Sequence, residues 1–414
     1  MESFITQRKG ENSITIKAQN DSGEFVSTGD FRVEKVRFCS RYVDMLLCCG
    51  IETKPYARRK GLVGRMLSMG EAFGRSRGAV FSVLHPFSFS FYRKYGYERV
   101  SDTLIISFPI RALDFVPYCN DLRPLTAEMV PRFREYYDSF NEKRNLMFGL
   151  PEDYKAPGNM YVLTDGGEIR GHVLVDNPKT FDGVNKMNGD GLTVREMGFA
   201  DPRSLGRILG FLRMFESEQP RVIIKDAGPL PEVDTYLKHY MDTSYVLRPD
   251  IMAKVLDSEK ALRLVRYRKA SGNLNALGNL NVSGNLNASG NLNVSGNLNA
   301  SGTPDASGAK CDSGTFTVRI NSAEPEVGGT FQIIPDADSP AVTRLCKADE
   351  AHGADGTANH DIEVSAQALS RLVFGCDSYT AETAAYLPGV VLSETSQKVL
   401  DAFPKQINGN FYHF

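Results

Sequence analysis

The segment covering residues 44–84 constrains the fold most, because it reads as strand, loop, helix and strand in close succession. Residues 44–53 (DMLLCCGIET) are almost continuously apolar, as in a buried central strand. A helical pattern of apolar side chains follows and ends at Gly78. Its apolar positions are Leu62, Met66, Met69 and Phe73. Residues 79–84 (AVFSVL) form a second buried strand, so we predict two parallel neighbours joined by a helical crossover.

Weaker signals flank this unit. Residues 13–18 and 31–38 alternate apolar and polar side chains, which predicts half-buried strands. A short helix is expected over 88–94, ahead of Gly96, and another strand over 103–108. The first part of the chain therefore predicts an α/β domain of mixed topology.

The loop between the central strand and its helix is basic and contains two glycines. Its sequence from residue 58 is Arg58-Arg59-Lys60-Gly61-Leu62-Val63-Gly64. The first amides of a helix lack partners within the helix, and the helix dipole is positive there, so such a loop can bind phosphate. Glycines allow close approach of a diphosphate to the backbone, and the cations add charge-assisted contacts. The alternative interpretation is a solvated basic turn.

A six-residue repeat, SGNLNA and its variants, runs from Ser271 and divides the chain. It is uncharged and rich in Gly, Ser and Asn, with Leu as its one sizeable apolar residue. A flexible linker is favoured, because such a segment buries too little surface to offset its ordering entropy. A short β-solenoid is the alternative, but about three hexapeptides form one turn, and five units give fewer than two turns.

The other two regions carry their own signals. In the second, MYVLTDGGEIRGHVLVDN predicts a hairpin that turns at Gly166 and Gly167. A second strand-then-helix junction follows at residues 201–206, but it contains Asp201 and lacks the glycine pair, so it should not bind a diphosphate. The last region predicts strands over 316–320 and 330–334 and a capped helix over 365–374.

Composition excludes several classes of protein. The net charge of −2 gives no general attraction to nucleic acid or to an anionic membrane. The seven cysteines are odd in number and never spaced C-x-x-C, and the six histidines are scattered, so neither a disulfide framework nor a metal site is expected. No apolar run approaches the ~20 residues of a membrane span, and no signal peptide is evident. A cytoplasmic protein is the default expectation.

Two motifs carry a resemblance to a known family. Arg58-x-x-Gly61-x-x-Gly64, placed after an apolar strand, resembles the coenzyme A signature of GNAT acetyltransferases, although Val63 stands where that signature has its last small residue. The form R-R-x-G-L-V is similar to that of the Eis (enhanced intracellular survival) subgroup. The segment Phe91-Tyr92-Arg93-Lys94-Tyr95-Gly96-Tyr97 resembles that subgroup's Y-x-x-F-G-Y segment, at matching distance.

The resemblance implies an α/β (α+β) architecture of tandem GNAT folds followed by a domain like sterol carrier protein. The N-terminal GNAT domain would cover residues 1–118, and a degenerate GNAT-like domain 119–268. The repeat linker would cover 269–309, and the sterol-carrier-like domain 310–414. Fewer residues precede the first predicted strand than in this family, whose extra N-terminal helices help to wall the amine pocket.

The same resemblance assigns roles to residues of the site. Tyr92 would be the general acid that protonates the coenzyme A thiolate, and the C-terminal carboxylate of Phe414 would be the general base. Without the resemblance, Tyr92 is more simply a packing aromatic, and residues 410–414 a frayed tail. The cosubstrate would be acetyl-CoA, with no metal. The residues expected to contact it are Ile51, Thr53, Arg58, Arg59, Lys60, Gly61, Leu62, Val63, Gly64, Phe87 and Ser88.

The expected activity is N-acetylation of a primary amine of an aminoglycoside, polyamine, peptide or lysine, by direct transfer in a ternary complex. The alternative is a non-catalytic acyl-CoA-binding or assembly protein that keeps the fold. His413 stands where an acid lines the site of aminoglycoside-acetylating members, so the amine is not identified. By resemblance, the chain would form a homo-oligomer, a hexamer, without nucleic-acid or membrane partners.

Overall fold

The computed structural model describes most of the chain outside the repeat. The described residues are 3–176, 191–225, 231–238, 241–267, 314–336, 339–347, 360–375, 384–385, 387, 389–393, 395–403 and 407–408. The expected linker over 269–309 and the C-terminal Phe414 lie outside them. None of the helices in the described ranges is both long and apolar enough to cross a bilayer.

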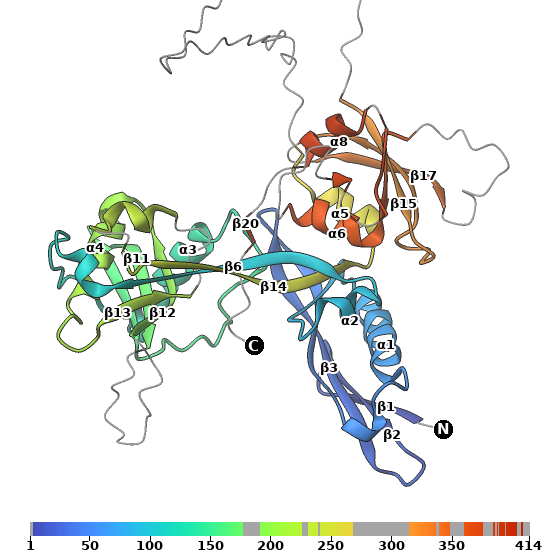
Figure 1. The fold of residues 1–414 in the computed structure, drawn as a ribbon, viewed down its shortest axis with the longest axis horizontal. Helices are drawn as coiled ribbons and strands as arrows, with labels where there is room; N and C mark the ends of the chain where they lie inside the picture. Colours follow the sequence, from blue (N-terminus) through green and yellow to red (C-terminus); the bar gives the residue numbers. More distant parts are fainter. Residues whose placement is uncertain are drawn as a thin grey trace, which may run out of the picture.

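Thirteen of the described strands form one continuous mixed sheet (Figure 1). Twelve of them follow one another across it in this order: β1 (Ser3–Arg8), β2 (Ser13–Gln19), β3 (Phe25–Phe38), β4 (Arg41–Thr53), β5 (Phe81–Leu84), β14 (Ser244–Val255), β6 (Glu98–Pro109), β13 (Arg221–Ile224), β12 (Leu192–Phe199), β11 (Glu168–Asp176), β10 (Met160–Asp165) and β7 (Arg123–Pro124). The thirteenth strand, β9 (Met147–Phe148), pairs with β3. The predicted parallel pair is confirmed, because β4 and β5 pair in parallel and helix α1 (Leu62–Ser76) connects them in the sequence.

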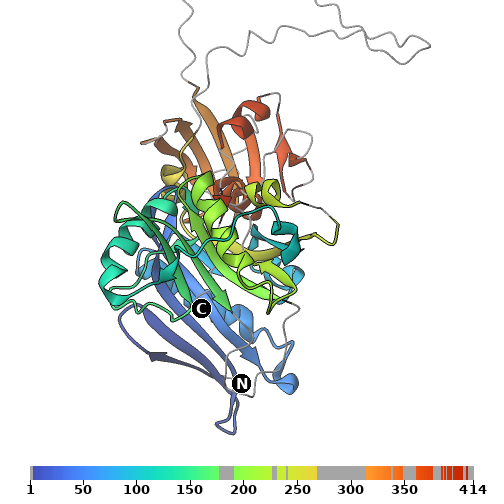
Figure 2. The ribbon, with the colours of Figure 1, turned by 90° about the vertical axis from the view of Figure 1, so that its left-hand side faces the viewer.

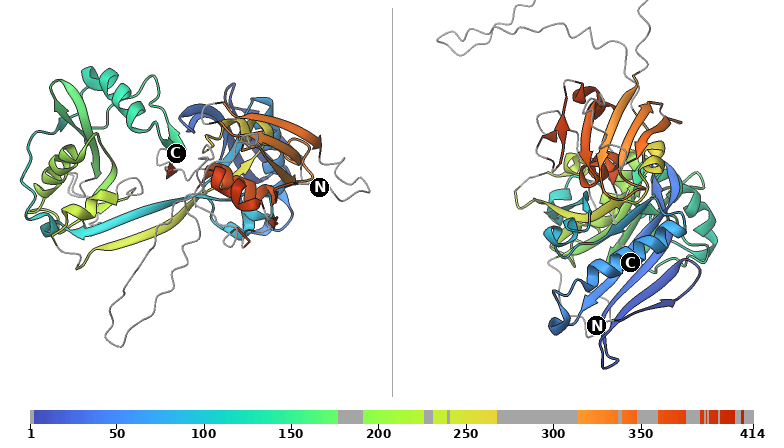
Figure 3. Two further views of the ribbon diagram at one scale, coloured as in Figure 1. Left: turned by 90° about the horizontal axis from the view of Figure 1, so that it is seen from above. Right: turned by 90° about the vertical axis from the view of Figure 1, so that its right-hand side faces the viewer.

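The strand β14 joins the first and second parts of the chain. It lies between β5 and β6, antiparallel to both, although more than a hundred residues separate it from them in the sequence. Its partner β6 continues past it to pair with β13. Figure 3 (left) shows β6 and β14 as a long ribbon between the two halves of the sheet. The sheet of the first region is therefore completed by a strand from the expected second region.

Helix α1 packs close to the sheet because two of its buried positions are glycines. A methyl group on Gly70 would lie 2.1 Å from the Phe31 ring, and one on Gly74 would lie 3.1 Å from Leu46 Cβ. The buried ridge accordingly runs from Leu62 through these glycines. Met69 and Phe73, which the sequence pattern placed on the buried face, are only half-buried at its edge. The pattern misses the glycines because they carry no apolar signal.

The second region contains the remaining elements of the large sheet. The hairpin of β10 and β11 turns at Gly166 and Gly167, which both have positive φ, as predicted. Helix α4 (Pro202–Arg213) crosses between the parallel strands β12 and β13. Helix α3 (Val130–Phe140) packs on β11. The second region thus repeats an arrangement of the first region: a strand, a helix and a parallel strand.

The C-terminal part forms a five-stranded sheet of its own, drawn in orange and red in Figure 1 and stacked beyond the large sheet in Figure 2. Its strands, in order, are β17 (Ala341–Lys347), β16 (Gly329–Ile334), β15 (Phe316–Asn321), β18 (Ile362–Ser365) and β19 (Val391–Leu392). The described residues of this part include the helices α5 (Ser258–Leu264), α6 (Ala366–Phe374) and α8 (Ser396–Ala402). The predicted cap of α6 is confirmed: Ser365 accepts from the Ala368 amide, and Gly375 is left-handed.

One core joins this C-terminal part to the large sheet. Helix α6 packs on β6 and β14, on the face opposite α1. There Phe374 of α6 meets Phe38 and Phe81, with ring centroids 4.9–5.2 Å apart. Buried aromatic contacts of this kind stabilise a fold strongly, so the two parts form a single hydrophobic unit.

Candidate active site

The site begins where β4 and β5 part. Their pairing covers only Met45–Leu47 against Phe81–Val83, although β4 continues to Thr53 and stays paired with β3 on its other side. In the described part of the chain, the backbone of residues 48–53 therefore has no strand partner on the β5 side. Ile51 and Thr53 lie in this stretch. Such an edge can accept an extended, amide-bearing ligand as an added strand.

The basic loop follows at the carboxyl end of β4. The Arg58 Nε donates to the Thr53 carbonyl oxygen at 3.2 Å, which folds this side chain back on the strand. Arg59, Lys60 and Gly61 are exposed. Gly61 is the N-cap of α1, no side chain caps the helix, and no acidic residue lies in its first turn. The positive end of this helix is thus directed at the surface without a built-in anion, which suits a phosphate.

Gly61 and Gly64 each have a different structural reason to be glycine. Gly61 adopts φ +74°, a left-handed conformation, and a methyl group on it would meet open space. A methyl group on Gly64 would lie 2.6 Å from Tyr95 Cε1, so this glycine is required for packing, beyond any role in ligand approach. Leu62 is buried and anchors the helix start, and Val63 is half-buried. The Gly64–Tyr95 contact joins the loop to the second motif.

The second motif forms the short helix α2 (Phe89–Arg93). Ser88 is its N-cap and accepts a hydrogen bond from the Phe91 amide at 3.4 Å. Phe87, 71% exposed, stands beside Tyr92, with ring centroids 5.3 Å apart. The two residues predicted to flank the cosubstrate therefore have clear local positions at the start of this helix.

Tyr92 is buried, with 3% of its surface exposed. Burial, followed by the nearby Cys48 and Tyr95, raises its pKa to about 12, so the phenol keeps its proton at neutral pH. Within the described residues no hydrogen bond to the Tyr92 hydroxyl is found, and its ring is packed among Phe87, Phe91 and Tyr97. A phenol that keeps its proton at neutral pH fits a general acid.

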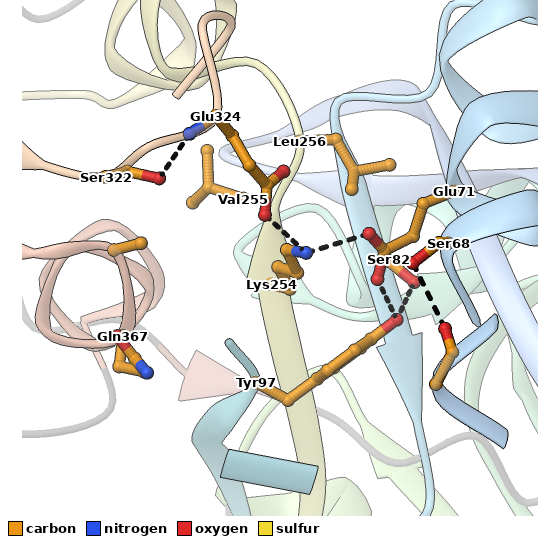
Figure 4. A network of polar contacts seen from close by, with 12 residues as sticks. Ser68, Glu71, Ser82, Tyr97, Lys254, Val255, Leu256, Ser322, Glu324 and Gln367 are labelled. Atoms are coloured by element: carbon orange, nitrogen blue, oxygen red, sulfur yellow. Dashed lines mark hydrogen bonds and ion pairs between the residues drawn. The ribbon is translucent and has the colours of Figure 1, made fainter. Parts of the chain in front are cut away.

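A chain of buried polar groups runs behind the site (Figure 4). The Cys48 thiol lies 3.3 Å from the Ser82 hydroxyl, which lies 2.6 Å from the Tyr97 hydroxyl. Tyr97 donates to Glu71 of α1 at 3.2 Å. Burial is the main cause that raises the pKa of Glu71, and Lys254 opposes it. These polar contacts link β4, which carries Cys48, to helix α1, which starts at the basic loop.

These buried polar contacts end in a cluster of ion pairs between the large sheet and the C-terminal part. Lys254 of β14 lies 2.8 Å from Glu71 and 2.8 Å from Glu324, a residue of the C-terminal part (Figure 4). Arg75 of α1 also pairs with Glu324. Glu71 and Lys254 are both almost fully buried, so each compensates the other's charge.

A histidine–aspartate pair at the end of β5 was not predicted. The His85 Nδ1 lies 3.1 Å from the Asp250 Oδ1, and the Thr103 hydroxyl donates to Asp250 Oδ2 at 2.6 Å. The partners are 165 residues apart in the chain, so no local sequence signal could have joined them. Nothing of Phe414 is described, but β20 (Ile407–Asn408), six residues before it, pairs with β8 (Arg144–Asn145).

Among the described residues there is no group of three or more His, Cys, Asp or Glu side chains that could hold a metal ion.

Comparison with known proteins identifies the first region. Residues 5–100 match the family described as acetyltransferase (GNAT) domain. No curated protein sequence matches the chain. The mixed α/β chain thus contains a GNAT acetyltransferase domain, and the basic loop and Tyr92 lie within it.

Solved structures share the fold over almost the whole chain. A GCN5-related N-acetyltransferase from Anabaena variabilis has a TM-score of 0.67 at 13% identity, covering 95% of this chain and 88% of that one. One from Kribbella flavida has 0.66 at 16%, covering 96% and 86%. Eis1 from Mycobacterium abscessus has 0.62 at 14%, covering 95% and 89%. At these identities the likeness concerns the fold alone.

Proposed function

We propose that the chain is an Eis-like, acetyl-CoA-dependent N-acetyltransferase that acts on a primary amine by direct transfer. The observation that carries this proposal is the junction of its two motifs. An uncapped, acid-free helix start follows the carboxyl end of β4, and Gly64 of that helix packs on Tyr95, three residues from Tyr92. An anion site and a protonated phenol are thereby held together on one GNAT domain.

The cosubstrate supplies an acetyl thioester. In the proposal its diphosphate binds the amides at the start of α1, with Arg58, Arg59, Lys60, Gly61, Leu62, Val63 and Gly64 around it. Ile51 and Thr53 offer backbone groups to its amide-bearing arm, and Phe87 and Ser88 flank that arm. The exposed cations and the uncapped helix support this placement.

Tyr92 holds the proton that the departing thiolate needs, and its raised pKa of about 12 keeps that proton in place. The C-terminal carboxylate of Phe414 is the proposed general base. Support comes from β20, which pairs with β8. The residue after β8, Leu146, donates its amide to the Arg37 carbonyl oxygen of β3 at 2.8 Å, so Ile407 and Asn408 pair with a segment that contacts the N-terminal domain.

The proposal extends to the whole chain. The second region is a degenerate GNAT copy: Asp201 caps α4, accepting from the Ser204 amide at 2.8 Å, and its pKa is lowered to about 2, chiefly by that backbone hydrogen bond. This helix start therefore already holds an anion. We also infer a C-terminal domain like sterol carrier protein, a repeat linker over 269–309, a cytoplasmic location and a hexamer.

A thiol-release assay tests the proposal. The full chain, given acetyl-CoA and a panel of aminoglycosides, polyamines, lysine and peptides, should release free thiol in proportion to an acetylated amine detected by mass spectrometry. Tight binding of coenzyme A without turnover of any amine would instead support the non-catalytic alternative.

A one-residue extension after Phe414 tests the proposed base. Moving the carboxylate by one residue should lower kcat by about 10²–10⁴-fold, the usual contribution of a positioned proton acceptor, and leave the affinity for coenzyme A unchanged. Amidation of the terminus by ligation is the matched chemical change. Full activity in the extended chain would remove the carboxylate from the mechanism.

A further inference from the structure

Both helices of the candidate site contact the C-terminal part at their carboxyl ends. Helix α1 starts at the basic loop and has Arg75 in its last turn, where Arg75 pairs with Glu324 of the C-terminal part. Helix α2 carries Tyr92, and the carbonyl oxygen of its last residue, Arg93, accepts from the Gln367 side chain of α6 at 3.4 Å. The anion-binding loop and the proposed acid are therefore each connected to the C-terminal part through a single helix.

The contact with α1 is a group of four alternating charges. Glu71 and Arg75 lie one turn apart on α1. Lys254 lies 2.8 Å from Glu71 and 2.8 Å from Glu324 (Figure 4), and Arg75 pairs with Glu324 as well. The side chain of Lys254 is 7% exposed, whereas that of Glu324 is 38% exposed. Exposed ion pairs contribute little to stability, but here the central cation lies out of water, so its pairing with both carboxylates matters more.

The loop that carries Glu324 is held by its own hydrogen bonds. The Glu324 carbonyl oxygen accepts from the Val327 amide at 2.9 Å and from the Gly328 amide at 2.8 Å. The Glu324 amide donates to the Ser322 hydroxyl at 3.2 Å. The strand β16 starts immediately afterwards, at Gly329. Because this turn is already ordered, its carboxylate loses little conformational entropy when it pairs with α1.

The end of α2 is fixed from two sides. Arg93 forms a bidentate ion pair with the buried Glu98 of β6, at 2.7 and 2.8 Å. Helix α6 packs on β6 and supplies Gln367 from the C-terminal part. The turn that follows α2 then returns to the proposed acid, because the Tyr97 amide donates to the Tyr92 carbonyl oxygen at 3.3 Å. The position of Tyr92 therefore depends on how the end of its helix is held.

Lys254 connects the two contacts. A methyl group on Gly96, in the turn after α2, would lie 3.3 Å from Lys254 Cε, so this turn packs on the lysine stem. Glu71, the partner of Lys254 on α1, accepts from the Tyr97 hydroxyl of the same turn at 3.2 Å. The ends of both helices thus meet at one buried lysine that the C-terminal part helps to neutralise.

We propose that the C-terminal part positions the acetyl-transfer site through these contacts, with Glu324 acting on α1 and Gln367 acting on α2. The assignment rests on the proposed function. Both are positioning residues, because each acts through a helix and not on the ligand itself. Rigid helices and ion-pair networks can carry a coupling of this kind between distant places in a fold.

Two substitutions in the full chain should separate the two contacts. Glu324→Gln keeps the size of the side chain but removes its charge, so coenzyme A should bind about 3–30-fold more weakly, with a smaller change in kcat at saturation. Gln367→Ala should lower kcat by about 3–30-fold and leave the affinity for coenzyme A near that of the wild type. Calorimetric titration measures the affinity, and steady-state kinetics with an accepted amine measure kcat.

Glu326→Gln and Gln397→Ala are the matched controls. Glu326 is an exposed residue of the same loop as Glu324. Gln397 donates to Asp401 within helix α8 at 2.8 Å. Both control variants should match the wild type in affinity and in kcat. Losses in the controls as large as those in Glu324→Gln and Gln367→Ala would overturn the assignment.

Hydrogen exchange gives a readout that a merely structural contact would not change. Because coupling between two places is reciprocal, coenzyme A should slow exchange of the Val327 and Gly328 amides in the wild type, although both lie in the C-terminal part. In Glu324→Gln, this protection should disappear even at saturating coenzyme A.

Two results would overturn the assignment while leaving the proposed function intact. One is exchange at these amides that coenzyme A does not change in the wild type. The other is a pair of variants, Glu324→Gln and Gln367→Ala, that lose affinity and kcat equally or lose neither. A wild type that neither binds coenzyme A nor acetylates any amine would contradict the proposed function itself.

Discussion

Replacing Tyr92 by Phe should lower kcat by about 10²–10⁴-fold, because the change removes the proton donor for the leaving thiolate. The Phe ring keeps the packing against Phe87, Phe91 and Tyr97, whose ring centroids lie 5.2–6.1 Å from that of Tyr92. The melting temperature and the affinity for coenzyme A should therefore stay near wild type. Steady-state kinetics with a saturating amine measure kcat, and calorimetric titration measures the affinity for coenzyme A.

Tyr95→Phe is the control for this prediction, because Tyr95 lies one turn away and packs on Gly64. Its kcat should stay close to wild type. The pH dependence gives a second readout: with a pKa of about 12, Tyr92 should cause no fall in kcat between neutral pH and about pH 10. A Tyr92→Phe enzyme as active as the Tyr95→Phe enzyme would exclude the phenol as the acid.

Replacing Lys254 by Ala should destabilise the protein by about 3–5 kcal/mol, because it leaves the buried carboxylate of Glu71 without its cation. Glu71 is 4% exposed, and Lys254 lies 2.8 Å from it. The change also loosens Glu324 and so weakens the contact between the GNAT domain and the C-terminal part. Urea unfolding followed by circular dichroism measures the loss.

Lys260→Ala is the matched control, because Lys260 pairs with Asp257 at the surface and is 61% exposed, so its loss should cost about 0–1 kcal/mol. The sign of the pH dependence follows from Glu71, whose pKa in the folded protein is raised above 4.5 by burial. Such a group favours the folded state below its ordinary pKa and loses that contribution as pH rises. Removing Lys254 raises this pKa further.

The Lys254→Ala penalty should therefore shrink as the pH is lowered from about 8 toward about 5. Adding Glu71→Gln to the variant should recover part of the stability at neutral pH, because the uncompensated charge is gone. A penalty that is equal for Lys254 and Lys260, and constant with pH, would contradict the buried ion pair.

The local parts of the fold could be predicted because their signals are short. The apolar run before Thr53, the helical spacing after Leu62 and the Gly166–Gly167 turn each depend on neighbours in sequence. The strand β1 gave no such signal, because its side chains are mostly exposed. The position of β14 could not be predicted either, since which strand it pairs with depends on contacts more than a hundred residues away.

Which residues of the site could be predicted also depends on their distance from one another in the sequence. The basic loop and Tyr92 belong to continuous motifs, and the sequence could therefore indicate them. His85 and Asp250 meet only because β14 lies beside β5, and Glu71 meets Lys254 for the same reason. The role of Gly64 also needed the structure, because its tight contact with Tyr95 comes from a residue 31 positions later.

Titration of coenzyme A into the full chain by calorimetry tests the central claim most directly, when wild type is compared with Arg59→Ala and Arg203→Ala. Arg59 lies in the loop before α1, and Arg203 lies in the first turn of α4, where Asp201 already supplies the anion. We predict one-to-one binding by the wild type. Arg59→Ala should bind about 10–100-fold more weakly, as the loss of a charge-assisted hydrogen bond implies, whereas Arg203→Ala should match the wild type. No binding by the wild type, or equal affinities in all three proteins, would contradict the account.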